Sequence, residues 1–113
     1  MKYALLIYNR EGSGGRSSPE IPAAVAAVLE RPEVRGYSRL EASETATTVT
    51  SGGGRTLLTD GPFVDSKEYL GGLIFLEAPD LDGALAIATE LQEIGITTGI
   101  EVRPVFDQEL GGA

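Results

Sequence analysis

The sequence predicts an α+β fold, a ferredoxin-like split βαβ sheet with an extra hairpin strand. Two observations lead to this class. Patterns typical of strands and helices follow one another in the order β-α-β-β-β-α-β. The first and fourth strand patterns are also apolar on both sides, which is typical of strands that are covered on two faces. Because 113 residues is an ordinary length for one domain, we expect a single domain over 1–113.

The N-terminal third predicts a strand, a polar loop and a helix. Residues 2–8 (KYALLIY) are rich in β-forming side chains, and the loop at 9–18 is rich in Gly and Ser. We expect the helix to open at Ser17, because Ser17 and Glu20 have the spacing of a capping box, and to end by Pro32. Its apolar residues at helical spacing are Ile21, Val25, Val28 and Leu29.

The middle of the chain predicts a β-hairpin and a long strand. After residues 33–44, whose pattern is ambiguous, the segments 45–50 and 55–60 are strand-like and are joined by glycines. A turn-forming Asp-Gly-Pro sequence follows. The next segment, 70–78 (LGGLIFLEA), is again apolar on both faces, so we expect it to lie inside the sheet.

The C-terminal third predicts a second helix and a last strand. Asp80 is a natural N-cap, and Gly95 suits the position just after the helix. The strand at 99–106 alternates, with Glu101 and Arg103 on the same face. The residues expected to form the buried stripe of the helix are Leu81, Leu85, Ala88, Leu91 and Ile94.

The second face of the predicted sheet needs a cover. Two helices of this length can cover only one face of it. Because strands 2–8 and 70–78 are apolar on both sides, the simplest cover is a twofold-related copy of the same chain. We therefore expect a homodimer whose sheets pack face to face.

Composition excludes several classes of function. The chain has no cysteine and no histidine, which removes thiolate and imidazole metal sites, thiol nucleophiles and the Ser-His-Asp triad. We expect no cofactor and no bound metal. The net charge of −8 argues against nucleic acid and against an anionic membrane surface. No apolar run is long enough for a signal peptide or a membrane span, so we expect a cytoplasmic location.

Three segments carry a resemblance to a known family. MKYALLIY (1–8), ATTVTSGGGRTLLTDGPFVDSKEYLGG (46–72) and IEVRPV (100–105) together resemble the YCII-related family in its DGPF-domain branch, named after the tetrapeptide at 60–63. The resemblance covers 1–106 and implies a dimeric α+β barrel. It also implies that a few relatives act on small aromatic or chlorinated compounds with a His–Asp pair. Because this chain has no histidine, that mechanism does not carry over.

Asp60 has two possible roles. As the first residue of the Asp-Gly-Pro corner, its carboxylate can cap the turn. Alternatively, it is a pocket carboxylate that acts as a general base, which requires its pKa to be raised by burial or by a like charge. Phe63 would anchor the loop in the core or across the dimer interface.

The remaining candidates are the charged and aromatic residues that this fold could bring near Asp60. We expect a pocket between the sheet and the loops, with Asp60 or Glu68 as the catalytic base and Arg103 or Lys67 as the electrostatic stabiliser. The residues predicted to be catalytic are Asp60, Glu68 and Arg103, and those predicted to bind a ligand are Tyr8, Lys67 and Glu101.

Two functions are consistent with these residues. The first is a small-molecule-binding homodimer with carboxylate acid–base chemistry on a small organic compound. The alternative is a non-catalytic interaction or regulatory protein, whose TDGPF loop serves contacts with itself or with another protein.

Overall fold

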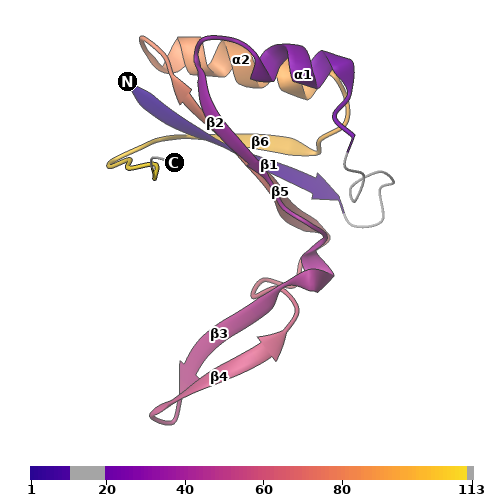
Figure 1. The fold of residues 1–113 in the computed structure, drawn as a ribbon. Coiled ribbons are helices and arrows are strands. Elements are labelled where there is room, and N and C mark those ends of the chain that lie inside the picture. Colours follow the sequence, from indigo (N-terminus) through magenta and orange to yellow (C-terminus); the bar gives the residue numbers. More distant parts are fainter. Residues whose placement is uncertain (11–19, 112–113) are drawn as a thin grey trace.

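The computed structural model describes residues 1–10 and 20–111. It contains a four-stranded antiparallel sheet in the order β2-β5-β1-β6, a separate two-stranded hairpin, and two α-helices among the described residues (Figure 1). When the four strands of this sheet are numbered by their order along the chain, they lie in the order 2-3-1-4. This is the strand order of a ferredoxin-like split βαβ fold, as predicted. The elements are β1 (Lys2–Arg10), α1 (Ala23–Leu29), β2 (Val34–Arg39), the short 3-10 helix η1 (Ser43–Thr45), β3 (Thr47–Gly52), β4 (Arg55–Asp60), β5 (Glu68–Glu77), α2 (Leu81–Glu93) and β6 (Gly99–Pro104).

The structure resolves the ambiguous segment 33–44 and corrects the predicted place of the hairpin. The ambiguous segment contains β2, which is an edge strand of the sheet and pairs with β5. The predicted hairpin exists, with Val49 opposite Leu58, but its strands form their own small sheet rather than adding a strand to the larger one. The two-residue alternation of side chains along β2 cannot be recognised in the sequence, because a register shift lies between Val34 and Gly36.

The core lies between one face of the sheet and the two helices (Figure 1). Tyr3 and Leu5 of β1 pair with Leu76 and Ile74 of β5, and all four side chains are buried on this face. The buried residues that α1 and α2 contribute are Val28, Ala84, Ile87, Ala88 and Leu91. These helices therefore cover the face of the sheet that carries the odd-numbered residues of β1.

The helix boundaries correct several details of the sequence reading. α1 begins at Ala23 after Pro22, which makes no side-chain cap, while the predicted capping residue Ser17 lies outside the described residues. The predicted caps of α2 are confirmed: the Asp80 carboxylate accepts a hydrogen bond from Gly83 N at 2.9 Å, and Gly95 has φ +88°. The buried stripe of α2 starts at Ala84, and the predicted stripe residues Leu81 and Leu85 are exposed.

The other face of the sheet carries no described helix and has an apolar centre, and we call it the open face. Its centre is formed by partly exposed side chains: Ala4, Leu6, Tyr8, Leu70, Leu73 and Phe75. Among the described residues, three ion pairs lie around this centre: Lys2–Glu77, Arg10–Glu68 and Arg103–Glu101. The C-terminal tail reaches the β2 edge of this face, where Leu110 lies beside Gly36. An apolar centre within a polar rim is the usual anatomy of a protein interface.

The hairpin and its flanking loop extend away from the sheet and helices (Figure 1). We call residues 46–67 the hairpin arm. β3 and β4 pack on each other and make no extensive contact with the larger sheet or with α1 and α2 in the described part of the chain. None of the helices within residues 1–10 and 20–111 is long and apolar enough to cross a bilayer.

The carboxylate of Glu77 links stability to pH. Its Oε2 lies 2.7 Å from the Met1 ammonium, and its Oε1 lies 3.8 Å from Lys2 Nζ. The hydrogen bond with the ammonium lowers the pKa of Glu77 below its ordinary value of 4.5, so the folded state binds that proton more weakly than the unfolded state. The stability that this ion pair contributes is present above the pKa of Glu77 in the unfolded state. It is lost as the pH falls through the lower pKa of Glu77 in the folded state.

Replacing Glu77 by glutamine should therefore flatten the acid side of the stability profile. We expect the urea midpoint of the wild type to fall from about pH 5 to about pH 3, and that of Glu77→Gln to fall less over the same range. Glu44→Gln, at an exposed position of η1, controls for the lost negative charge. Parallel profiles for the wild type and Glu77→Gln would show that this carboxylate has no part in the acid response.

Candidate functional site

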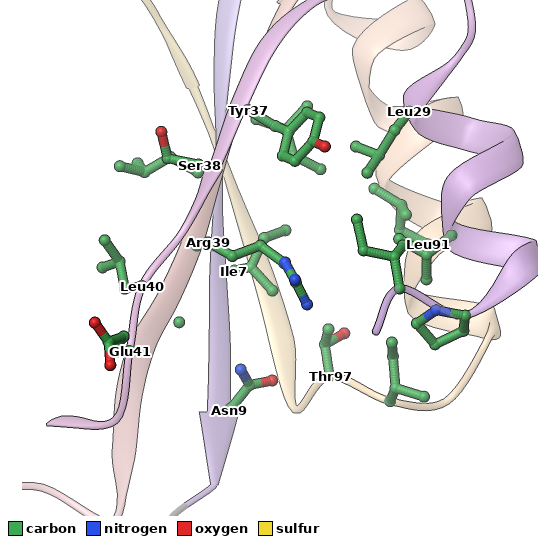
Figure 2. A pocket seen from close by; sticks show the side chains of 18 of the residues that line it. Ile7, Asn9, Leu29, Tyr37, Ser38, Arg39, Leu40, Glu41, Leu91 and Thr97 are labelled. Carbon is green, nitrogen blue, oxygen red and sulfur yellow. The ribbon is translucent and has the colours of Figure 1, made fainter. Parts of the chain in front are cut away.

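A pocket of about 740 Å³ lies on the helix-covered side of the sheet, between α1 and the end of β2 (Figure 2). This volume is within the range that small organic ligands occupy in proteins. Strands β1 and β5 form its floor, α1 forms one wall, and the segment from β2 to η1 forms the opposite side. With α2 and the loop after it, five parts of the chain contribute to the pocket.

The walls toward the helices are apolar. Val25 and Leu29 of α1 and Leu91 of α2 line this side, together with Ile7 of β1 and Ile96 in the loop after α2. Figure 2 shows Leu29 and Leu91 facing the space that Ile7 enters from the sheet. Such a lining favours the hydrocarbon body of a small ligand over a highly charged one.

Polar groups gather at the other end of the pocket. Tyr37 and Arg39 are two residues apart on β2, so both point to the helix-covered face, opposite Ile74 and Gly72 of β5. Figure 2 shows the Arg39 side chain reaching into the pocket, with Asn9 beneath it and the Tyr37 ring turned toward the helices. Arg39 also donates from Nη1 to the carbonyl oxygen of Glu20 at 3.4 Å. A guanidinium has five N–H donors, so it can serve such a backbone contact and a ligand oxygen together.

The loop between α2 and β6 is held firmly at the edge of the pocket. Thr97 donates its hydroxyl hydrogen to Gln92 Oε1 at 2.9 Å, and Gln92 Nε2 donates to the Thr97 carbonyl at 3.1 Å. These reciprocal bonds fix Thr97, which lines the pocket with its neighbour Ile96. We therefore treat this edge as a preformed part of the site.

Two glycines of β5 let its neighbours approach the pocket floor closely. A Cβ on Gly71 would lie 2.2 Å from Asn9 Nδ2, and one on Gly72 would lie 3.0 Å from the carbonyl oxygen of Ser38. Gly71 is also the extra residue at the register shift between Ile7 and Tyr8 of β1. The LGG segment noted in the sequence thus shapes the floor of the pocket through its missing side chains.

Four of the six predicted site residues lie on the open face, on the far side of the sheet from this pocket. Tyr8 and Glu68 are at one end of that face, where Arg10 Nη2 lies 3.2 Å from Glu68 Oε1. Glu101 and Arg103 share that face of the edge strand β6 and pair at 2.9 Å. These four residues are thus brought onto one surface, but none of them lines the pocket. The edge position of β6 agrees with the presence of Pro104.

One oxygen of the Glu68 carboxylate has a hydrogen-bond partner, and the other has none among the described residues. Its Oε1 accepts from Arg10, whereas its Oε2 is buried and has no hydrogen-bond partner among the described residues. A buried carboxylate oxygen without a donor is costly, so this atom needs a partner that the single chain does not provide in the part described.

The other two predicted residues, Asp60 and Lys67, lie in the hairpin arm. Both are exposed, and neither makes an ion pair with a described residue. The turn after Asp60 is closed by Gly61 N donating to the Ala46 carbonyl at 2.8 Å and by the Thr48 hydroxyl donating to the Gly61 carbonyl at 2.7 Å. In the described part of the chain the Asp60 carboxylate accepts no hydrogen bond at this turn, and the side-chain bond there comes from Thr48.

The polar pocket residues Asn9, Tyr37, Arg39 and Thr97 were missed by sequence reasoning. Tyr37 and Arg39 fall in the segment whose pattern was ambiguous, because the register shift near Gly36 interrupts the alternation of β2. Reading VRGYSR as a strand would have placed both side chains on one face. No local signal marks Asn9, which reaches the pocket through the pairing of β1 with distant strands, or Thr97, which lies in the loop between α2 and β6.

Comparison with known proteins agrees with the sequence resemblance. The family model of the YCII-related domain matches residues 1–109. An uncharacterised protein of Rhizobium meliloti (strain 1021) is 32% identical over 114 residues, which cover 93% of this chain and 92% of that protein. Among solved structures, 5-chloro-2-hydroxyhydroquinone dehydrochlorinase (TftG) of Burkholderia phenoliruptrix, in complex with 2,5-dihydroxybenzoquinone, is similar with a TM-score of 0.51. It is 18% identical over 93% of both chains, so this likeness shows the fold alone.

Proposed function

The chain belongs to the YCII-related family, and on that premise we propose that it is a homodimer that binds a small organic molecule in the pocket between α1 and β2. The observation that carries this proposal is the pocket itself. It is large enough for a ligand with one ring, apolar toward the helices, and polar at the end that holds Arg39 and Asn9.

A small ring that carries oxygen atoms, such as a phenol or a monobasic acid, suits this lining, which holds the Arg39 cation together with the carboxylates of Glu20 and Glu41. An apolar ring would lie against Leu29 and Leu91, and a carboxylate, phenolate or carbonyl oxygen would accept hydrogen bonds from Arg39 and Asn9. The ligand in the structure of the dehydrochlorinase, 2,5-dihydroxybenzoquinone, is a small ring that carries oxygen atoms, which supports a ligand of this size and polarity here.

The homodimer is supported by the open face. Its apolar centre is bordered by three basic and three acidic side chains in the three ion pairs, together with the Met1 ammonium beside Glu77, so this ion-paired rim carries no excess negative charge although the net charge of the chain is −8. Two copies can therefore bring these faces together without the repulsion that their other surfaces would cause. A partner copy would also bring a donor to Glu68 Oε2.

The acid–base activity predicted for Asp60, Glu68 and Arg103 stays a prediction that depends on this dimer. Glu68 and Arg103 are on the open face, and a second copy would enclose them and raise the strength of their interactions. The alternative, a non-catalytic interaction protein, is favoured by one observation: the hairpin arm exposes apolar side chains far from the pocket.

The ligand proposal is tested by binding measurements on matched arginine variants. We expect at least one compound from a set of benzoic acids, phenols, quinones and short aliphatic acids to raise the melting temperature of the wild type. Arg39→Leu should weaken binding of that compound by about 10- to 100-fold, the effect of losing a hydrogen bond to a charged group. Arg35→Leu, on the same strand but outside the pocket, is the control and should bind normally.

Two results would count against this site. One is that no compound of these classes stabilises the wild type. The other is that Arg39→Leu and Arg35→Leu bind the ligand with equal affinity, which would place the ligand elsewhere on the molecule.

A further inference from the structure

The hairpin arm carries an apolar surface that its own chain leaves uncovered. Val49 and Leu58 are directly paired on one face of the hairpin, and their side chains are 65% and 72% exposed. Phe63 follows the hairpin and is 77% exposed, with Val64 beside it also exposed. Figure 1 shows that the arm stands apart from the sheet and helices that could otherwise cover these side chains. Apolar groups gathered in this way mark an interaction surface.

A hairpin of two strands is marginally stable at best in water when nothing packs on it. The two bonds at the root of the arm, from Gly61 N to Ala46 and from Thr48 to Gly61, join its strands but cover none of the apolar side chains. The exposed face of Val49 and Leu58 therefore needs a partner that is present whenever the protein is folded. A second copy of the same chain is such a partner.

The charge of the hairpin arm agrees with a second copy of the chain as its partner. The arm contains Arg55 and Lys67 as its basic residues and Asp60 and Asp65 as its acidic residues, so its net charge is zero in a chain of net charge −8. The ion-paired rim of the open face likewise carries no excess negative charge. Two copies of an acidic protein repel each other least where neutral, apolar surfaces meet.

We propose that the hairpin arm packs its Val49–Leu58 face and Phe63 onto a second copy of this chain, and that the arm of the second copy packs onto the first in the same way. This inference rests on the homodimer proposed above and adds a second contact to the open face. In a twofold dimer the same contact covers both arms at once, whereas a single partner of another kind would leave the open face uncovered.

The Asp60-Gly61-Pro62-Phe63 motif acquires a role at this contact. Gly61 has φ +100°, a conformation that other residues rarely adopt, and it turns the chain at the root of the arm. Pro62 restricts the backbone beyond the turn. Phe63 is thereby held with its ring in solvent in the single chain, where a partner can cover it.

The first test uses single introduced thiols, because the natural chain has no cysteine. Leu58→Cys and Thr59→Cys place a thiol on opposite faces of β4, and both positions are exposed in the single chain. We expect the reaction of Leu58→Cys with a maleimide to slow by at least about tenfold when the protein is concentrated from the nanomolar to the micromolar range. Thr59→Cys should react at the same rate throughout.

The second test measures the dimer dissociation constant of two lysine variants by analytical ultracentrifugation. We expect Leu58→Lys to raise the Kd by at least about tenfold and Thr59→Lys to change it by less than about threefold. If the wild type dimerises but both lysine variants share its Kd and the Leu58→Cys thiol reacts equally at all concentrations, the arm contact is overturned and the homodimer stands. If the wild type is a monomer of 11.9 kDa at all concentrations, both proposals fail.

Discussion

Replacing Leu6 by lysine is expected to dissociate the proposed homodimer into monomers at micromolar concentration. Leu6 lies on β1, inside the sheet, at the apolar centre of the open face opposite Leu73 and Glu101. In a single chain the new ammonium group can reach solvent at the edge of this partly exposed face. In the face-to-face dimer two such groups would be buried by symmetry, and desolvating them costs several kcal/mol.

The expected result is a rise in the dimer Kd of at least about 100-fold, which corresponds to about 2.7 kcal/mol. Light scattering across a concentration series measures it. Leu85→Lys is the matched control, because Leu85 is an exposed apolar residue of α2 on the other side of the molecule. An unchanged Kd for a folded Leu6→Lys variant would mean that the open face is not the interface.

Replacing Val25 by tryptophan is expected to abolish the ligand binding proposed for the pocket. Val25 lies on the wall that α1 contributes, facing the floor formed by β1 and β5. The larger indole would occupy the space that a one-ring ligand needs, and a well-packed pocket cannot expand to accept both. Affinity for a ligand found with the wild type should fall by at least about 100-fold, as measured by calorimetric titration.

The controls separate blocking from unfolding. Ala27→Trp introduces the same side chain on the exposed side of α1 and should leave binding unchanged. Should Val25→Trp fail to fold, Ile21→Trp fills the same wall from the segment before α1. Wild-type affinity in a folded Val25→Trp or Ile21→Trp variant would remove the pocket as the ligand site.

Much of the fold could be predicted because its signals are local. The double-sided apolar pattern of residues 2–8 and 70–78 correctly predicted the two central strands, β1 and β5. Asp80 and Gly95 correctly predicted the ends of α2, because capping depends on side chains and φ values within one turn. The hairpin was predicted from its glycines and its β-forming residues for the same reason.

Less of the candidate site could be predicted. Tyr8, Glu68, Glu101 and Arg103 were chosen for their chemistry and do share one face, as the alternation of β6 indicated for the last two. Their distance from the pocket could not be seen, because the pocket opens on the other face of the same strands. The Leu6→Lys variant tests whether a second copy covers these four residues on the open face.

The sequence by itself determined the family, the central strands, the hairpin, the caps of α2 and the lack of histidine and cysteine side chains in this chain. Only the tertiary structure decided that Asn9, Tyr37 and Arg39 meet in one pocket and that the hairpin stands apart from the sheet. The physical reason is that periodicity shows which side of a strand a residue faces, whereas strand pairing decides which residues become neighbours. The alignment of those neighbours then depends on the register shifts at Ile7/Tyr8 and Val34/Gly36. No local sequence pattern predicts these shifts.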